Sequence, residues 1–168
     1  MNLKNQTLLM AAAAVTIFNF QSCSKYEDNS GLQLKSKTGR LTGEWEVVKI
    51  GGQNPETYLN NNSYSSPYYQ VEISNVSMEW EFEKDEDFKF KQSYDRSVTY
   101  SFGYGYTNTY TSTVNDSYKG EWEWENNKEE LEIEYDNYTQ EFEILKLTNK
   151  ELTLEDENGV EWEFEKDD

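Results

Sequence analysis

The feature that most constrains the fold of this chain is a repeated alternation of glutamate with apolar residues. Tryptophan, phenylalanine, methionine or valine occupies the positions between acidic residues in Ser77–Glu83, Gly120–Glu125 and Val160–Glu165. Successive side chains of a β-strand point to opposite faces, so this pattern predicts strands with one apolar and one hydrated face. Because no segment keeps the spacing of an amphipathic helix, we expect almost no helix.

The composition taken alone resembles that of a disordered chain. Leucine, isoleucine, valine and phenylalanine make up just under a fifth of the 168 residues, and the net charge is −18. Such values usually mark disorder. Here, however, 5 tryptophans and 13 tyrosines add apolar surface, and their regular placement favours a packed fold.

The charge and the missing residue types exclude several functions. A chain with 33 acidic and 15 basic residues is a poor partner for phosphate backbones, so no nucleic-acid binding is expected. The chain has no histidine, which removes the serine-protease triad, histidine-ligated zinc and histidine-ligated haem. We therefore predict neither an enzyme nor a bound cofactor.

The N-terminal residues 1–22 have the pattern of a secretory signal peptide. Lys4 precedes the apolar segment Leu8–Phe20, which is too short and too interrupted to span a membrane. The segment ends just before Cys23, the only cysteine, and the small residue Ser22 precedes it. This arrangement resembles a bacterial lipoprotein signal, which implies a mature chain anchored to a membrane through lipidated Cys23. The alternative is an ordinary secretory signal followed by a free thiol.

Residues 23–38 have no usable periodicity and are expected to form a flexible, lipid-anchored tether. Lys25, Glu27 and Asp28 follow the cysteine closely, and they resemble the surface-export signal of Bacteroidetes lipoproteins. The resemblance implies an outer-membrane lipoprotein. Its position at the cell surface or on the periplasmic face stays open.

Residues 39–168 are predicted to form one domain of consecutive β-hairpins. Short polar turns are expected at Asn126–Glu129, Asp136–Asn137, Asn149–Lys150 and Glu157–Gly159, because each brings apolar residues of neighbouring strands onto one face. A change of parity between Ile144 and Leu145 predicts a β-bulge. These hairpins fit a single antiparallel up-and-down β-barrel of about 8–10 strands, which closes its own edges.

Short motifs of aromatic, glycine and aliphatic residues mark several segments of this domain. They are Leu41-Thr-Gly43-Glu-Trp45, Phe82 with an acidic turn before Phe88, Tyr118-x-Gly120-x-Trp122, Leu131-x-Ile133 and Phe142–Leu154. Over roughly residues 40–154 these segments resemble the lipocalin-like lipoproteins of Bacteroidetes-type bacteria. The resemblance implies a lipocalin-like barrel on a lipid anchor, with no general enzymatic activity. In typical lipocalins an arginine of the last strand stacks on the opening tryptophan, and here that strand offers Lys166.

Large aromatic residues are the candidates for lining a ligand-binding cup. Rings with polar tips suit a small amphipathic ligand or a glycan. The alternative is that these residues form the core or stabilise hairpins. The candidates are Trp45, Trp80, Phe82, Tyr100, Phe102, Tyr106, Trp122 and Trp124.

Glutamates of neighbouring strands are expected to face one another on the hydrated side of the barrel. Glu123 would lie opposite Glu132, and like charges in that position destabilise a strand pair. A Ca²⁺ ion would relieve this repulsion. No segment has a calcium-loop spacing, so we expect a solvated face and no metal site. Glu79 and Glu81, in contrast, are predicted to face lysines.

The sequence therefore predicts a lipid-anchored, water-facing barrel of the cell envelope that binds a small amphipathic ligand or a glycan in an aromatic cup. The alternative is a structural or interaction lipoprotein with a filled barrel. Such a protein would contact another envelope protein through its loops or its acidic wall.

Overall fold

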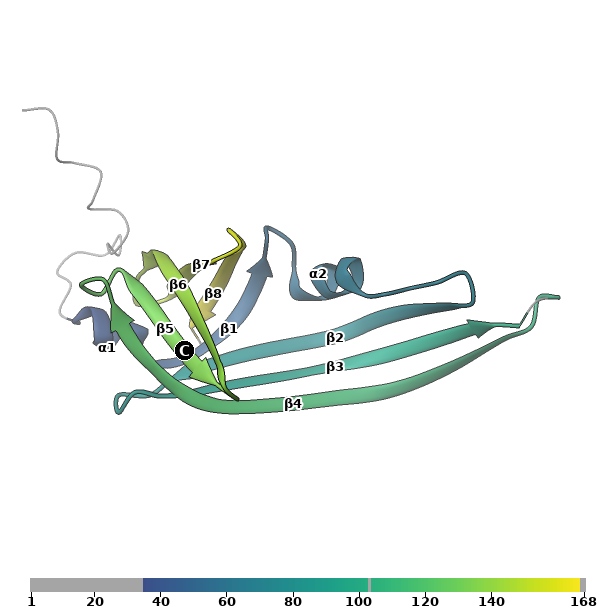
Figure 1. Cartoon of the computed structure of the whole chain (residues 1–168), viewed down its shortest axis with the longest axis horizontal. Helices are drawn as coiled ribbons and strands as arrows, with labels where there is room; N and C mark the ends of the chain where they lie inside the picture. Colours follow the sequence, from purple (N-terminus) through teal and green to yellow (C-terminus); the bar gives the residue numbers. More distant parts are fainter. Residues whose placement is uncertain (1–34, 103, 167–168) are drawn as a thin grey trace, which may run out of the picture.

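The computed structural model describes residues 35–102 and 104–166. Eight strands pair antiparallel in sequence order, and the last returns to the first, which closes a barrel (Figure 1). The predicted all-β, up-and-down antiparallel barrel is therefore confirmed, with eight strands. The elements are α1 (Lys37–Leu41), β1 (Gly43–Ile50), α2 (Pro55–Asn62), β2 (Tyr69–Phe82), β3 (Asp87–Ser101), β4 (Thr107–Glu125), β5 (Glu130–Tyr135), β6 (Tyr138–Leu147), β7 (Glu151–Asp156) and β8 (Glu161–Lys166).

The turn residues set the strands in the predicted register. Asp136 and Asn137 both adopt positive φ angles, which a two-residue hairpin requires, and Tyr135 lies opposite Tyr138. The other turns agree equally well. They place Trp124 opposite Leu131, Leu147 opposite Leu152 and Leu154 opposite Trp162, and the predicted bulge interrupts the register between Ile144 and Lys146.

Inward-facing side chains fill most of the barrel interior. The rings of Trp45, Phe82 and Trp122 are at most 2 % exposed. Full burial of one large apolar side chain contributes roughly 1.5–3 kcal/mol, so these rings replace the aliphatic residues that the composition lacks. Aliphatic and smaller aromatic side chains complete the core, among them Leu41, Val47, Ile50, Met78, Phe88, Leu131, Ile133, Phe142, Ile144, Leu147, Leu152, Leu154 and Phe164.

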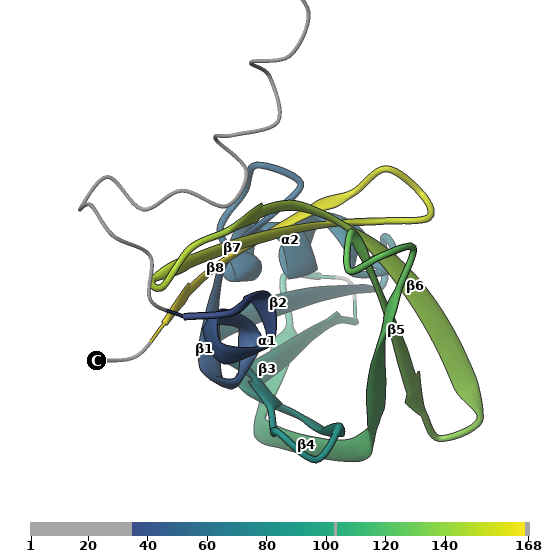
Figure 2. The ribbon, with the colours of Figure 1, turned by 90° about the vertical axis from the view of Figure 1, so that its left-hand side faces the viewer.

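Helix α1 covers one end of the barrel (Figure 2). The Ser36 side chain caps the helix by accepting a hydrogen bond from the Gly39 N–H. Leu41 is fully buried, and its carbonyl accepts a hydrogen bond from the Trp45 indole at 2.6 Å. Residues 36–38, which we expected in the tether, therefore belong to the folded barrel. The predicted signal peptide, together with Cys23 and the export residues, lies outside the described residues.

Strands β2, β3 and β4 continue well beyond the barrel as a three-stranded ribbon (Figure 1). They contain 14, 15 and 19 residues, whereas strands in globular proteins usually have about 3–10. β5 pairs only with Gly120–Glu125 of β4, so the preceding part of β4 has left the barrel wall. Below, "the ribbon" means Tyr69–Val76, Tyr94–Ser101 and Thr107–Asp116.

Helix α2 lies alongside β2, in a connection where almost no helix was expected (Figure 1). Asn54 caps it by accepting a hydrogen bond from Thr57 N at 2.8 Å, and Pro55 occupies the first turn. A helix of eight residues is not stable alone, and its contact with β2 supplies the missing stabilisation. Neither α1 nor α2 is long and apolar enough to cross a membrane, and the described residues contain no other α-helix.

Candidate functional site

An apolar cavity of about 200 Å³ lies inside the barrel, toward the end away from α1. Trp162 forms part of its wall and pairs with Ile50, at the end of β1 far from Gly43. A cavity of about 150 Å³ holds benzene, so this space suits a molecule of one or two rings. The lining comes from five strands and consists of Trp80, Phe88, Phe90, Ile133, Tyr135, Gln140, Phe142 and Trp162.

Trp80 lines this cavity with its ring and carries a buried indole N–H that has no partner among the described residues. The residue is 7 % exposed, and its ring lies against Phe142 and Phe164, with centroid distances of 5.5 and 5.0 Å. A buried donor left unpaired costs about 1–3 kcal/mol. Because this nitrogen is buried, a molecule in the cavity would recover that energy only if a small turn of the ring brought the N–H to an acceptor oxygen.

The structure does not bring the eight predicted lining residues together. Trp124 lies at the opposite end of the barrel, where its indole donates a hydrogen bond to Thr38 Oγ1 at 3.1 Å. The candidates buried in the core are Trp45, Trp80, Phe82 and Trp122, and among these only Trp80 lines the cavity.

Tyr100, Phe102 and Tyr106 lie outside the barrel. Phe102 is 68 % exposed and Tyr106 is 74 % exposed, at the far end of the ribbon. The structure does not place these three candidates in a ligand-binding cup, because β3 and β4 carry them past the barrel before the chain turns. The aromatic cup and the tyrosine-rich segment are therefore two separate surfaces.

Most of the cavity lining was missed at the sequence level. Phe90 and Trp162 share the inward parity of Phe88 and Phe164, so the alternation did place them inside the barrel. A void remains where the inward side chains do not fill the interior of the closed barrel, so its position depends on the volumes of all of them together. The alternation of inward and outward side chains does not show which inward residues border the cavity.

Lys166 occupies the closed end of the barrel, opposite the cavity. Its ammonium lies 4.5 Å from the centre of the Trp45 ring and donates hydrogen bonds to the carbonyls of Arg40 and Thr42 at 2.7 and 2.6 Å. Burial, with a smaller contribution from nearby Lys35, lowers the pKa of Lys166 to about 8. Lys166 thus gives this end of the barrel a charge that a modest rise in pH removes.

This lowered pKa predicts a pH-dependent stability. In the unfolded chain the Lys166 pKa returns to 10.5, so the unfolded state binds more protons between about pH 8 and 10.5. The free energy of unfolding of the native chain, relative to Lys166→Met, should therefore rise with pH across this window. Urea titrations at about pH 7.5 and 10 measure it. Lys146→Met, which removes a half-exposed lysine that pairs with Glu151, should show no such trend, and an equal trend in both variants would contradict the assignment.

The outer face of β4, β5 and β6 carries rows of glutamate that face one another across neighbouring strands. Glu123 lies opposite Glu132, which in turn lies opposite Glu141, as the alternation predicted for the first pair. Partial desolvation, followed by repulsion from Glu123, Glu125, Glu141 and Glu134, raises the pKa of Glu132. This acidic wall consists of Glu121, Glu123, Glu125, Glu130, Glu132, Glu134, Glu141 and Glu143.

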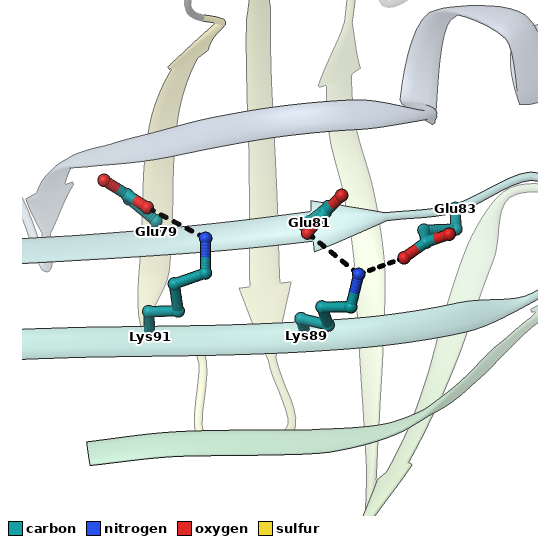
Figure 3. Close-up of polar contacts among 5 residues, drawn as sticks. All are labelled: Glu79, Glu81, Glu83, Lys89 and Lys91. Carbon is teal, nitrogen blue, oxygen red and sulfur yellow. Dashed lines mark hydrogen bonds and ion pairs between the residues drawn. The ribbon is translucent and has the colours of Figure 1, made fainter.

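The glutamates of β2 are balanced by lysines of β3 (Figure 3). As predicted, Glu79 lies opposite Lys91 and Glu81 opposite Lys89, with ion pairs of 3.5 and 3.3 Å. Lys89 also pairs with Glu83. These exposed pairs contribute little to stability, but they offset the repulsion between these glutamates on the outer face of β2 and β3.

Three carboxylates come close together in the turn between β2 and β3. Their oxygen atoms lie within 4.8 Å of one another, at Glu83, Asp85 and Asp87. Lys89 already neutralises Glu83, and the two aspartates are exposed to solvent. Ion pairing and hydration account for this cluster.

Comparison with known proteins gives one structural likeness. No protein-family model matches the chain, and no curated protein matches it. Among solved structures, the chain is similar to a lipocalin-like protein from Bacteroides uniformis ATCC 8492, with a TM-score of 0.43 and 16 % sequence identity. The likeness covers 77 % of this chain and 100 % of that one. The barrel described above rests on its own strand pairing.

Proposed function

We propose that this protein is a non-enzymatic, lipid-anchored binding protein of the bacterial envelope that holds one small, flat, amphipathic molecule inside its barrel. The observation that carries the proposal is the aromatic cavity with the unpaired indole N–H of Trp80. Small-molecule sites are largely apolar spaces with a few placed polar groups. The lining residues that carry polar groups are Trp80, Tyr135, Gln140 and Trp162, and the indole of Trp162 already bonds to Asp156.

The size of the cavity narrows the class of ligand. Pockets for drug-sized ligands measure about 300–1,000 Å³, whereas this one measures about 200 Å³. A glycan chain would not fit, and its hydroxyl groups would find few partners there. The fitting molecule has a planar ring, which packs on Trp80, Phe142 and Trp162, and one acceptor oxygen for the Trp80 indole.

Benzamide is a suitable probe, because it combines a flat ring with a carbonyl acceptor. With nine non-hydrogen atoms at about 0.5 kcal/mol each, its dissociation constant should be on the order of 1 mM. Trp80→Phe keeps a ring but removes the donor, and should weaken binding about fivefold in a calorimetric titration. Trp124→Phe, at the opposite end of the barrel, should bind like the native chain. Equal affinity of Trp80→Phe and the native chain would refute the role of the indole.

The membrane anchor in this proposal rests on the sequence pattern around Cys23. Lipidation there would place the barrel on the outer membrane, with Lys25, Glu27 and Asp28 directing it toward the surface. Cys23→Ser should move the protein from the membrane pellet to the soluble fraction of fractionated cells, because acyl chains supply the anchoring energy. Ser24→Ala serves as the control and should stay in the pellet. Retention of Cys23→Ser in the pellet would show that lipidation at this residue does not hold the protein there.

The alternative function, an interaction lipoprotein, is favoured by the acidic wall. Partial desolvation, followed by repulsion from four neighbouring glutamates, raises the pKa of Glu132, and no basic group among the described residues opposes that shift. A basic segment of another envelope protein would relieve this repulsion. Binding of oligolysine that weakens steeply with added salt, together with no benzamide binding, would favour this function over the first.

A further inference from the structure

The outer edge of β4 is an open strand edge over the length of the ribbon. Thr107–Lys119 pairs with β3 on one side, and pairing with β5 begins only at Gly120. The Trp122 N–H points toward β3, where it bonds to Glu86 O. Backbone groups alternate sides along an antiparallel strand, so those of the odd-numbered residues between 107 and 119 point outward. Within residues 35–102 and 104–166, no hydrogen bond reaches them outside the strand ladders.

The opposite edge of the ribbon, on β2, is covered. The Asn60 side-chain amide of α2 bonds to both backbone groups of Ile73, at 2.7 and 2.8 Å, as a neighbouring strand would. Glu56 Oε2 accepts a hydrogen bond from Asn75 N at 3.0 Å, and Ser65 Oγ accepts one from Val71 N at 3.2 Å. Side chains of the same chain thus satisfy backbone groups along the β2 edge, whereas the outward backbone groups of the β4 edge remain available for pairing with another strand.

Most of the open edge, Thr107–Asn115, lies in an uncharged segment of the chain. No residue between Ser97 and Asn115 is charged, in a protein of net charge −18. Elsewhere the acidic barrels of two copies would repel each other, but at this edge two copies can approach without that cost. Natural proteins usually protect such an edge with charge, proline or a cover, and Thr107–Thr113 has none of these, with every one of its residues exposed.

Exposed aromatic rings accompany this edge. Tyr110 on β4 packs against Tyr100 on β3, which packs against Tyr69 on β2, with centroid distances of 6.0 Å for both contacts. Tyr110 is nevertheless 60 % exposed. The row of rings therefore ends at the open edge with one of its sides uncovered.

We propose that two copies of this chain pair antiparallel through their β4 edges and form a symmetric dimer. The two ribbons then make one continuous six-stranded sheet, and the aromatic rows meet across the two-fold axis. Because the β2 edge is covered, the assembly closes at two copies and does not extend into a fibre. The dimer leaves the barrel cavity free, so it is independent of the ligand-binding proposal.

Sedimentation of the full chain with Thr111→Pro tests this dimer. Thr111 is odd-numbered, so proline there removes an outward N–H and leaves the pairing with β3 intact. The native chain should sediment as a dimer at roughly 100 µM, and Thr111→Pro should raise the dissociation constant at least tenfold. Thr111→Ala, which keeps the N–H, should dimerise like the native chain.

The melting temperature and the far-ultraviolet circular dichroism of Thr111→Pro check that the variant is folded. If it is not folded, Thr109→Lys with Thr113→Lys provides the second test, since like charges brought together at the edge should also separate the copies. If the native chain is a monomer at that concentration, the proposal is wrong. This holds even if the exposed tyrosine rings are then found to bind a soluble polysaccharide. A folded Thr111→Pro that dimerises as well as the native chain also overturns the proposal.

Discussion

Gly120→Ala is expected to destabilise the barrel by about 3 kcal/mol or more, because the added methyl group has no space. A Cβ atom at this position would lie 1.9 Å from the Glu134 carbonyl oxygen and 3.0 Å from Tyr135 Cβ. Gly120 is the first residue of β4 that pairs with β5, and β4 curves strongly along its length (Figure 1). The obstacle is backbone, which cannot rotate away as a flexible side chain would, so β5 would have to separate from β4.

A second glycine provides the control, because its replacement shows what the loss of a glycine costs when no atom blocks the added methyl group. Gly159 has a φ of 74° and open space around its Cβ position. Gly159→Ala should cost only about 1–2 kcal/mol, from backbone strain alone. Urea unfolding followed by circular dichroism compares the two variants. Equal losses at both positions would contradict the close approach of β5 to Gly120.

Trp45→Ala is expected to lower the free energy of unfolding by about 3–5 kcal/mol. The ring is fully buried, its indole donates to the Leu41 carbonyl, and it forms the surface on which the Lys166 ammonium lies. Removal of the ring leaves a large void and a partly buried cation without its aromatic contact. Since whole domains are stable by only about 5–15 kcal/mol, the loss is a large fraction of the total.

The matched control for Trp45→Ala is an exposed aromatic residue of the same barrel. Tyr138 on β6 is 69 % exposed, so Tyr138→Ala should change the free energy of unfolding by less than about 0.5 kcal/mol. Urea titration monitored by far-ultraviolet circular dichroism measures both. A small effect of Trp45→Ala would mean that the closed end of the barrel does not depend on this ring.

Much of the fold could be predicted from the sequence, because the turns and the alternation depend on local chemistry. Asp136 and Asn137 tolerate positive φ angles, and the parity change beside Ile144 marks a bulge; both determine register without any knowledge of tertiary structure. Helix α2 was missed, because its eight residues carry no helical pattern and it is stabilised by contact with β2. The capping pair Asn54–Pro55 was the available signal.

The candidate site was harder to predict than the fold. Alternation assigns Trp45 and Trp80 to the same inward face, yet one lies in a filled end and the other borders a cavity. The difference arises from α1 and Lys166, which occupy only one end of the barrel. In the same way, alternation places Tyr100 in a strand but cannot tell whether that strand lies over the core or runs past it.

The most direct test of a ligand site inside this barrel is the indole N–H spectrum of the five tryptophans during titration with benzamide. The Trp80 signal should move as its unpaired N–H gains an acceptor, with saturation at several millimolar. The Trp45 signal, whose N–H is already bonded to the Leu41 carbonyl, should stay in place. Toluene, which has no acceptor oxygen, should not cause the same shift at Trp80. A Trp80 signal that does not respond to benzamide at about 10 mM would contradict the proposed site.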